Sequence, residues 1–215
     1  MAQARTKALG RKEPRESALA NGVSPARAES RAWGRFALFS ECLLTGVWIA
    51  IASLGVVTCP AAFAAGCRHL RRGTAHEAGG LREFAADFRA ALRGGWLAGL
   101  VGWVLAAMVW VDVQAAGAGL PGGPLVGSVG LAALIGLAVT GMRAAATWTP
   151  GAGWRALLTD AGRRTVRDPA GSFLLVAGLA VVALSGWFVA PLAVPVLGAV
   201  AAAALAVETR YRHHR

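Results

Sequence analysis

Few residues of this 215-residue chain have both the type and the position to do chemistry. Glu41 is the only charged residue in the apolar range 36–67, and Asp112 follows the uncharged range 94–111. An ionisable group inside a membrane is a functional candidate, but a proton relay usually needs several such groups. Glu41 is therefore a candidate functional residue within the membrane. Its alternative role is to reach the cytoplasmic interface near Arg35, and Asp112 is expected to be solvated at the opposite interface.

Residues suited to metal binding or covalent catalysis lack the necessary spacing. His69 and His76 stand alone, His213 and His214 form a pair at the end of the chain, and the three cysteines fit no zinc-binding pattern. The sequence contains no Ser/His/Asp set, no HExxH motif and no Walker loop. We therefore expect no catalytic residues, no metal site, no cofactor and no enzymatic activity.

The composition indicates an integral membrane protein. Apolar residues make up 56% of the chain and charged residues 15%, against roughly 45–50% and about 25% in soluble domains. The ranges 94–111, 113–142 and 169–207 contain no charged residue. A membrane-spanning helix needs about 20 apolar residues, so the expected fold is an all-α, polytopic membrane protein.

The basic residues indicate the orientation of the chain. The net charge is +11, and all 22 Lys and Arg fall within 1–35, 68–93, 143–168 and 208–215. Loops rich in Lys and Arg are retained in the cytoplasm, and such segments attract anionic lipid headgroups. Because no recognition helix or stacking platform accompanies this charge, we expect a lipid bilayer with anionic headgroups, and no nucleic acid, as the partner.

Four basic segments on one side require an even number of crossings in each apolar block between them. This predicts six transmembrane helices arranged as three hairpins, with both termini in the cytoplasm. A basic, disordered tail (1–35) would precede a transmembrane domain (36–207), and a short basic tail (208–215) would follow it. The expected spans are 36–54, 57–72, 95–112, 125–142, 172–189 and 192–207.

The first hairpin has an alternative, because the stretch SLGVVTCPAAFAAGC (53–67) is interrupted in its middle. Pro60 suits the first turn of a new helix, with Thr58 or Cys59 as its N-cap. Two helices within 36–67 would have about 16 residues each, or about 24 Å, whereas the hydrocarbon core is about 30 Å thick. The alternative is therefore five full spans, with 60–72 as a re-entrant or interfacial helix.

Two amphipathic segments connect the predicted hairpins. Segment 81–93 places four apolar residues on one helical stripe, and segment 154–167 has a comparable stripe. Such helices lie at the headgroup level of a membrane or dock on a protein, which makes Phe84 and Phe88 candidates for docking a partner. The stripes consist of Leu81, Phe84, Phe88 and Leu92 in the first segment and of Trp154, Leu157, Leu158 and Ala161 in the second.

Residues 33–96 resemble the YesL-like family of bacterial membrane proteins. In that family a Ser-Leu-Pro-Val-Val-Thr-like turn ends the first helix, a Pro-Ala helix start follows, and a basic stretch and a Phe-rich segment come next. This sequence departs from the pattern at Gly55, where proline is usual, at Cys59, and in having Thr45 in place of an asparagine. The residues that agree are Ser53, Leu54, Val56, Val57, Thr58, Pro60 and Ala61, and the family-motif turn is represented by Thr58, Pro60 and Ala61.

The resemblance implies a role but no site chemistry. The family is a domain of uncharacterised function, and some members are encoded beside carbohydrate ABC importers. It implies an accessory or regulatory component of carbohydrate uptake in the bacterial inner (plasma) membrane, with an ABC transporter subunit as a partner. The alternative is a small permease in its own right.

Overall fold

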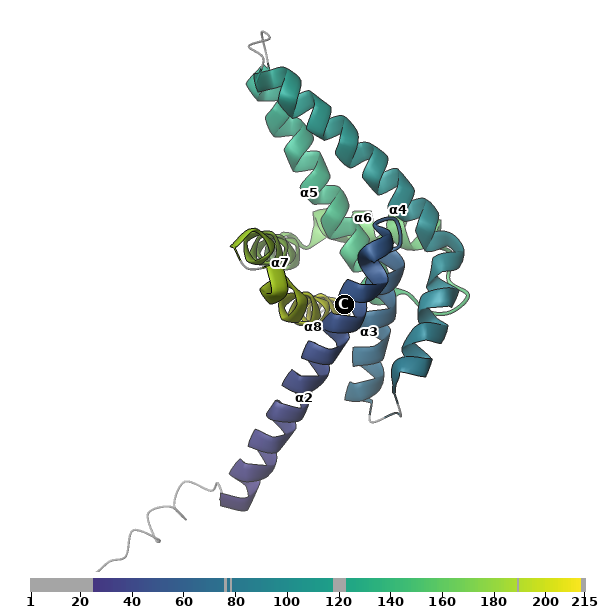
Figure 1. The fold of residues 1–215 in the computed structure, drawn as a ribbon, viewed down its shortest axis with the longest axis vertical. Coiled ribbons are helices and arrows are strands. Elements are labelled where there is room, and N and C mark those ends of the chain that lie inside the picture. Colours follow the sequence, from purple (N-terminus) through teal and green to yellow (C-terminus); the bar gives the residue numbers. More distant parts are fainter. Residues whose placement is uncertain (1–24, 76, 78, 118–122, 189, 214–215) are drawn as a thin grey trace, which may run out of the picture. The chain divides into compact units, whose positions relative to one another are not determined.

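The computed structural model describes residues 25–75, 77, 79–117, 123–188 and 190–213, and within these ranges it is all-α, with no strand. The chain forms two compact units, 1–40 and 41–215, and the contacts described below belong to the second. The helices are drawn in Figure 1. They are α2 (Pro25–Ala52), the 3₁₀ helix η1 (Ser53–Gly55), α3 (Cys59–Thr74), α4 (Leu81–Gly117), α5 (Gly123–Thr147), α6 (Trp154–Arg167), α7 (Pro169–Phe188) and α8 (Ala190–His213).

Four helical stretches among the described residues are long and apolar enough to cross a membrane. They are residues 81–115, 123–147, 169–188 and 193–212, and the stretch Phe39–Gly55 is apolar but shorter. The all-helical class is thus confirmed, and the four apolar helices are consistent with a membrane protein. The predicted number of six spans is not confirmed, because neither Phe39–Gly55 nor α3 is among the four.

The predicted interruption between residues 53 and 60 is confirmed. The helix α2 ends at Ala52, and α3 begins at Cys59 with Thr58 as its N-cap and Pro60 in its first turn. Proline is tolerated there because the first backbone N–H groups of a helix have no partner within the helix. Two helices therefore meet at this point.

The N-terminal part of α2 differs from expectation. Residues 25–35, expected within a disordered tail, are helical, whereas 1–24 lie outside the described residues. His76, His214 and the turn residues 118–122 also lie outside them.

The first amphipathic segment ends at a bend inside α4. The backbone of Arg93 and Gly94 leaves the helical region, which divides α4 into an amphipathic part and an apolar part. The Trp154 indole N–H donates a hydrogen bond of 2.9 Å to the Ala91 carbonyl, which in a continuous helix would accept from Gly95. The first residue of α6 is thus hydrogen-bonded to α4 just before the bend.

We expect Trp154→Phe to lower the free energy of unfolding by about 1–3 kcal/mol, because the ring is retained while the buried Ala91 carbonyl loses its donor. Chemical unfolding in detergent, followed by circular dichroism, measures this. Trp110→Phe is the control, since Trp110 is 65% exposed and a change within about 0.5 kcal/mol is expected. Equal effects of the two substitutions would contradict this role of Trp154.

The long helices form two hairpins, α4–α5 and α7–α8, which meet at the end of α5. We call this meeting point the base. The pairs α4–α5 and α7–α8 pack against each other within each pair, and the end of α5 also contacts α6, α7 and α8. Figure 1 shows α4 and α5 along the plane of view, whereas α7 and α8 are seen nearly end-on, so the hairpins leave this base in different directions. Helices crossing one bilayer tilt by about 20° on average. The predicted arrangement of three hairpins that cross one bilayer is therefore not confirmed.

The surfaces of the hairpins are apolar. Large side chains point outward on α4, α5 and α7, for example Trp110 (65% exposed), Leu125 (71%) and Phe173 (75%). Continuous apolar surface of this kind is unfavourable in water and indicates contact with a membrane or a protein.

Candidate functional site

Three buried charged side chains gather where α5, α6, α7 and α8 meet. Arg143 is fully buried, and Glu208 and Arg164 are 3% and 7% exposed. Arg143 directly follows the uncharged range 113–142, and Glu208 directly follows the uncharged range 169–207. A buried charge is tolerated only when it is paired and hydrogen-bonded, so the partners of these groups define the site.

Arg143 lies at the centre of the cluster. Its Nη2 donates to Asp168 Oδ2 at 2.9 Å, and its Nη1 donates to Glu208 Oε1 at 3.3 Å. One guanidinium near the end of α5 therefore holds the residue before α7 and the last part of α8.

Arg164 extends the cluster to α6. It pairs with the second oxygen of Glu208 and with Asp160, the latter at 3.1 Å. Arg210 approaches the other oxygen of Asp168 at 3.5 Å. The resulting chain alternates in sign and contains three cations and three anions, in the order Arg210, Asp168, Arg143, Glu208, Arg164 and Asp160.

Asp168 is held in place by its own helix. It is the N-cap of α7, where Oδ1 accepts the Gly171 N–H at 3.0 Å and Pro169 occupies the first helical position. A Cβ on Gly171 would overlap the Asp168 carboxylate and lie 2.7 Å from Arg143 Nη2. Glycine at this position is thus what makes room for the ion pair.

The contacts of Asp168 make the free energy of unfolding depend on pH. Burial raises the pKa of Asp168, but the Gly171 N–H and the Arg143 guanidinium outweigh burial and lower the pKa below its ordinary value of 3.8. The stabilisation is therefore complete above pH 3.8 and is lost as the pH falls through the folded-state pKa. We expect Asp168→Asn, which retains the N-cap, to remove this part of the acid sensitivity of unfolding. An unchanged slope of unfolding free energy against pH in the variant would contradict the assignment.

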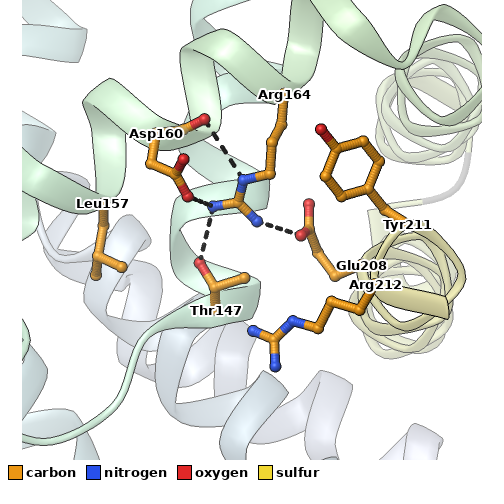
Figure 2. A pocket seen from close by; sticks show the side chains of 7 residues that line it. All are labelled: Thr147, Leu157, Asp160, Arg164, Glu208, Tyr211 and Arg212. Carbon is orange, nitrogen blue, oxygen red and sulfur yellow. Dashed lines mark hydrogen bonds and ion pairs between the residues drawn. The ribbon is translucent and has the colours of Figure 1, made fainter. Parts of the chain in front are cut away.

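A cavity of about 380 Å³ opens beside this cluster. Figure 2 shows Asp160 and Arg164 of α6 facing Glu208 of α8, with their ion pairs dashed. The Arg164–Glu208 ion pair forms one part of the cavity wall, and apolar, polar and charged side chains form the rest. Its lining residues are Thr147, Leu157, Asp160, Arg164, Glu208, Tyr211 and Arg212.

A second charged cluster joins α2, α3 and α4. Asp87 pairs with Arg68 at 3.1 Å and with Arg72 at 2.6 Å. Glu41, for which the sequence shows no partner, lies 3.7 Å from His69 Nε2, and a Cβ on Gly73 would overlap its carboxylate. Glu41 is thus part of a helix contact, and whether it also has a function within the membrane stays a prediction.

The family-motif turn has a structural role. The Thr58 hydroxyl donates to the Ala52 carbonyl at 2.6 Å, and Ala61 is fully buried. The Trp103 indole donates to the Val56 carbonyl at 3.0 Å. Thr58 and Pro60 thus shape the turn between α2 and α3, while Ala61 packs beneath it.

The two candidate docking residues lie inside the unit. Phe84 is 4% exposed, and its ring centroid is 5.4 Å from that of Trp48. Phe88 packs, partly buried, against the core. In this conformation these two side chains pack on their own chain and do not present a docking surface, whereas Leu81 of the same stripe is 62% exposed.

The sequence interpretation did not single out Arg143, Asp168, Arg164 and Glu208. Three of them have a signal in the sequence, since Arg143, Asp168 and Glu208 are the charges that border the uncharged ranges 113–142 and 169–207. Their pairing could not be inferred, because it depends on which helix ends meet.

No protein family, curated protein or solved structure compared with this chain matches it. The resemblance to the YesL-like family is therefore supported by the turn and connector residues alone. Among the described residues, no group of three or more His, Cys, Asp or Glu is placed to hold a metal ion. In both clusters the charged groups are engaged with one another, an arrangement that joins helices.

Proposed function

We propose that this chain is a multi-pass protein of the bacterial plasma membrane that serves as a non-catalytic accessory or regulatory component of carbohydrate uptake, with an ABC transporter subunit as its partner. The supporting observation is the placement of charge. The buried charged groups are paired at the base of the hairpins, and the ranges 113–142 and 169–207 between them carry none.

This placement favours an accessory role over a permease. Transporters bind substrate and coupling ions near the middle of the membrane, at polar or ionisable groups and unwound helix segments. Within the helical stretches α5 and α7, the described residues between 123 and 142 and between 169 and 188 include no charged side chain. A charged substrate would therefore meet no ionised partner along these helices.

The base is proposed to face the cytoplasm, with both termini on that side. Exposed arginines lie on the first part of α4 and on α6, where they meet anionic headgroups as basic segments near membranes do. These residues are Arg82, Arg89, Arg93, Arg155, Arg163 and Arg167.

Co-purification in mild detergent tests the role. We expect a subunit of a carbohydrate ABC transporter to be enriched with the tagged chain relative to an unrelated multi-pass protein. The double variant Arg163→Glu/Arg167→Glu reverses charge on the exposed side of α6, and the matched variant Arg82→Glu/Arg89→Glu does so on α4. Loss of the subunit in only one variant would locate the docking face.

A second measurement separates this proposal from a permease. Liposomes containing this chain alone should show no flux of sugars or ions above that of protein-free liposomes. Flux through the isolated chain, or the absence of any transporter subunit from the purified material, would contradict the proposal.

A further inference from the structure

Two charged groups at the cavity between α6 and α8 have capacity that the ion-pair chain does not use: Arg212 lies outside the chain, and Asp160 is its last member. Arg212 is exposed and lines the cavity, and within the described residues it has no ion pair or hydrogen bond. The side chain of Asp160 is 67% exposed, and only its Oδ2 is engaged, by Arg164 at 3.1 Å. Among the residues that the structure describes, the cavity therefore offers one cation without an ion pair, Arg212, and one carboxylate oxygen without an ion pair, on Asp160.

The remaining charges at the cavity are satisfied. Glu208 accepts from Arg143 with one oxygen and from Arg164 with the other. Arg164 is bound by Glu208 and Asp160 and also approaches the Thr147 hydroxyl at 3.4 Å. A ligand consequently meets side chains that are already ion-paired, and it can interact with Arg212 and with the second carboxylate oxygen of Asp160.

The two free groups lie apart on different helices. Figure 2 shows Asp160 on α6 and Arg212 on α8 on opposite sides of the Arg164–Glu208 pair, and the side chains of Leu157 and Tyr211 form further parts of the wall. A purely anionic ligand would be attracted by Arg212 and repelled by Asp160. A purely cationic ligand would be attracted by Asp160 and repelled by Arg212.

We propose that this cavity binds an ammonium–phosphate zwitterion, the chemistry of a phosphoethanolamine headgroup. The phosphate accepts hydrogen bonds from the Arg212 guanidinium, and the ammonium donates to Asp160, both charge-assisted contacts. The cavity adjoins the ends of α5 and α8, where their uncharged ranges stop at Arg143 and Glu208. Phospholipid headgroups are concentrated where apolar spans end, and a soluble phosphoethanolamine ester would supply the same groups. This inference does not depend on the accessory role in uptake.

Isothermal titration of the full chain in a detergent without phosphate or amine groups tests the proposal. Glycerophosphoethanolamine should bind saturably, whereas inorganic phosphate and ethanolamine alone should each bind at least about tenfold more weakly, since each uses one of two charge-assisted contacts. Nanodiscs with and without phosphatidylethanolamine distinguish the lipid headgroup from the soluble ester.

Three variants assign the contacts. Arg212→Gln and Asp160→Asn should each weaken glycerophosphoethanolamine binding by about tenfold or more, whereas Asp112→Asn, at an exposed position on α4 away from this cavity, should leave it unchanged. Thermal unfolding of each variant shows whether the fold is retained. If Asp160→Asn disturbs Arg164, the Arg212 variant alone decides whether the cavity binds the zwitterion. Equal binding of inorganic phosphate and the zwitterion, full binding by the Arg212 variant, or no saturable binding would overturn the proposal.

Discussion

Replacing Arg143 with glutamine is expected to lower the free energy of unfolding by about 3–5 kcal/mol, as removal of one partner from a buried ion pair does. Arg143 is fully buried and holds both Asp168 and Glu208. Its loss leaves two largely buried carboxylates with one cation each, Asp168 with Arg210 and Glu208 with Arg164. The helix ends that these residues belong to, on α5, α7 and α8, should then separate at lower denaturant concentration.

Arg210→Gln is the matched control, because Arg210 approaches the same Asp168 at 3.5 Å but its side chain is 48% exposed. An exposed pair of this kind contributes between about 0 and 1 kcal/mol. Chemical unfolding of both variants in the same detergent compares them. An Arg143 variant as stable as the Arg210 variant would show that the buried cluster does not hold the base together.

Gly99→Ala is expected to destabilise the fold by about 1–3 kcal/mol, as overpacking of a filled interface does. A Cβ at Gly99 would overlap the backbone carbonyl of Val57 in the turn between η1 and α3. Because the obstacle is backbone, no rotation of a side chain relieves the overlap. The turn and α4 must move apart, which also strains the hydrogen bond from Trp103 to Val56.

Gly102→Ala, three residues further along the same helix, should instead raise the free energy of unfolding. Nothing lies within 4 Å of a Cβ built at Gly102, and alanine is favoured over glycine inside a helix by roughly 0.5–1 kcal/mol. Unfolding free energies of the two variants, measured together, should therefore fall on either side of the parent protein. A shift in the same direction for both would contradict the close approach at Gly99.

Local signals in the sequence predicted the helices well. The Thr58–Pro60 signal located the start of α3, and the amphipathic ranges 81–93 and 154–167 correspond to the first part of α4 and to α6. Capping preferences and 3.6-residue periodicity act within a few residues, so one sequence is sufficient to reveal them.

The packing of these helices was not predictable in the same way. The apolar stripe of 81–93 was expected to face lipid or a partner, yet Phe84 is buried beside Trp48. Amphipathicity shows that a face must be covered but not by what. The pairing of Glu41 with His69, and of Arg143 with Glu208, likewise depends on tertiary contacts between residues far apart in sequence.

The most direct test concerns the side of the membrane on which the charged base lies. Cys42, Cys59 and Cys67 would be replaced by serine, and single cysteines introduced as Ala75→Cys, Thr159→Cys and Val113→Cys, all at exposed positions. Thr159 lies on α6 at the base, Ala75 directly follows α3 within the basic range 68–93, and Val113 lies near the far end of α4. A membrane-impermeant thiol reagent should label only position 113 in intact cells and should reach positions 75 and 159 after permeabilisation. Labelling of position 75 or 159 in intact cells would contradict a cytoplasmic base and the even number of crossings inferred from it.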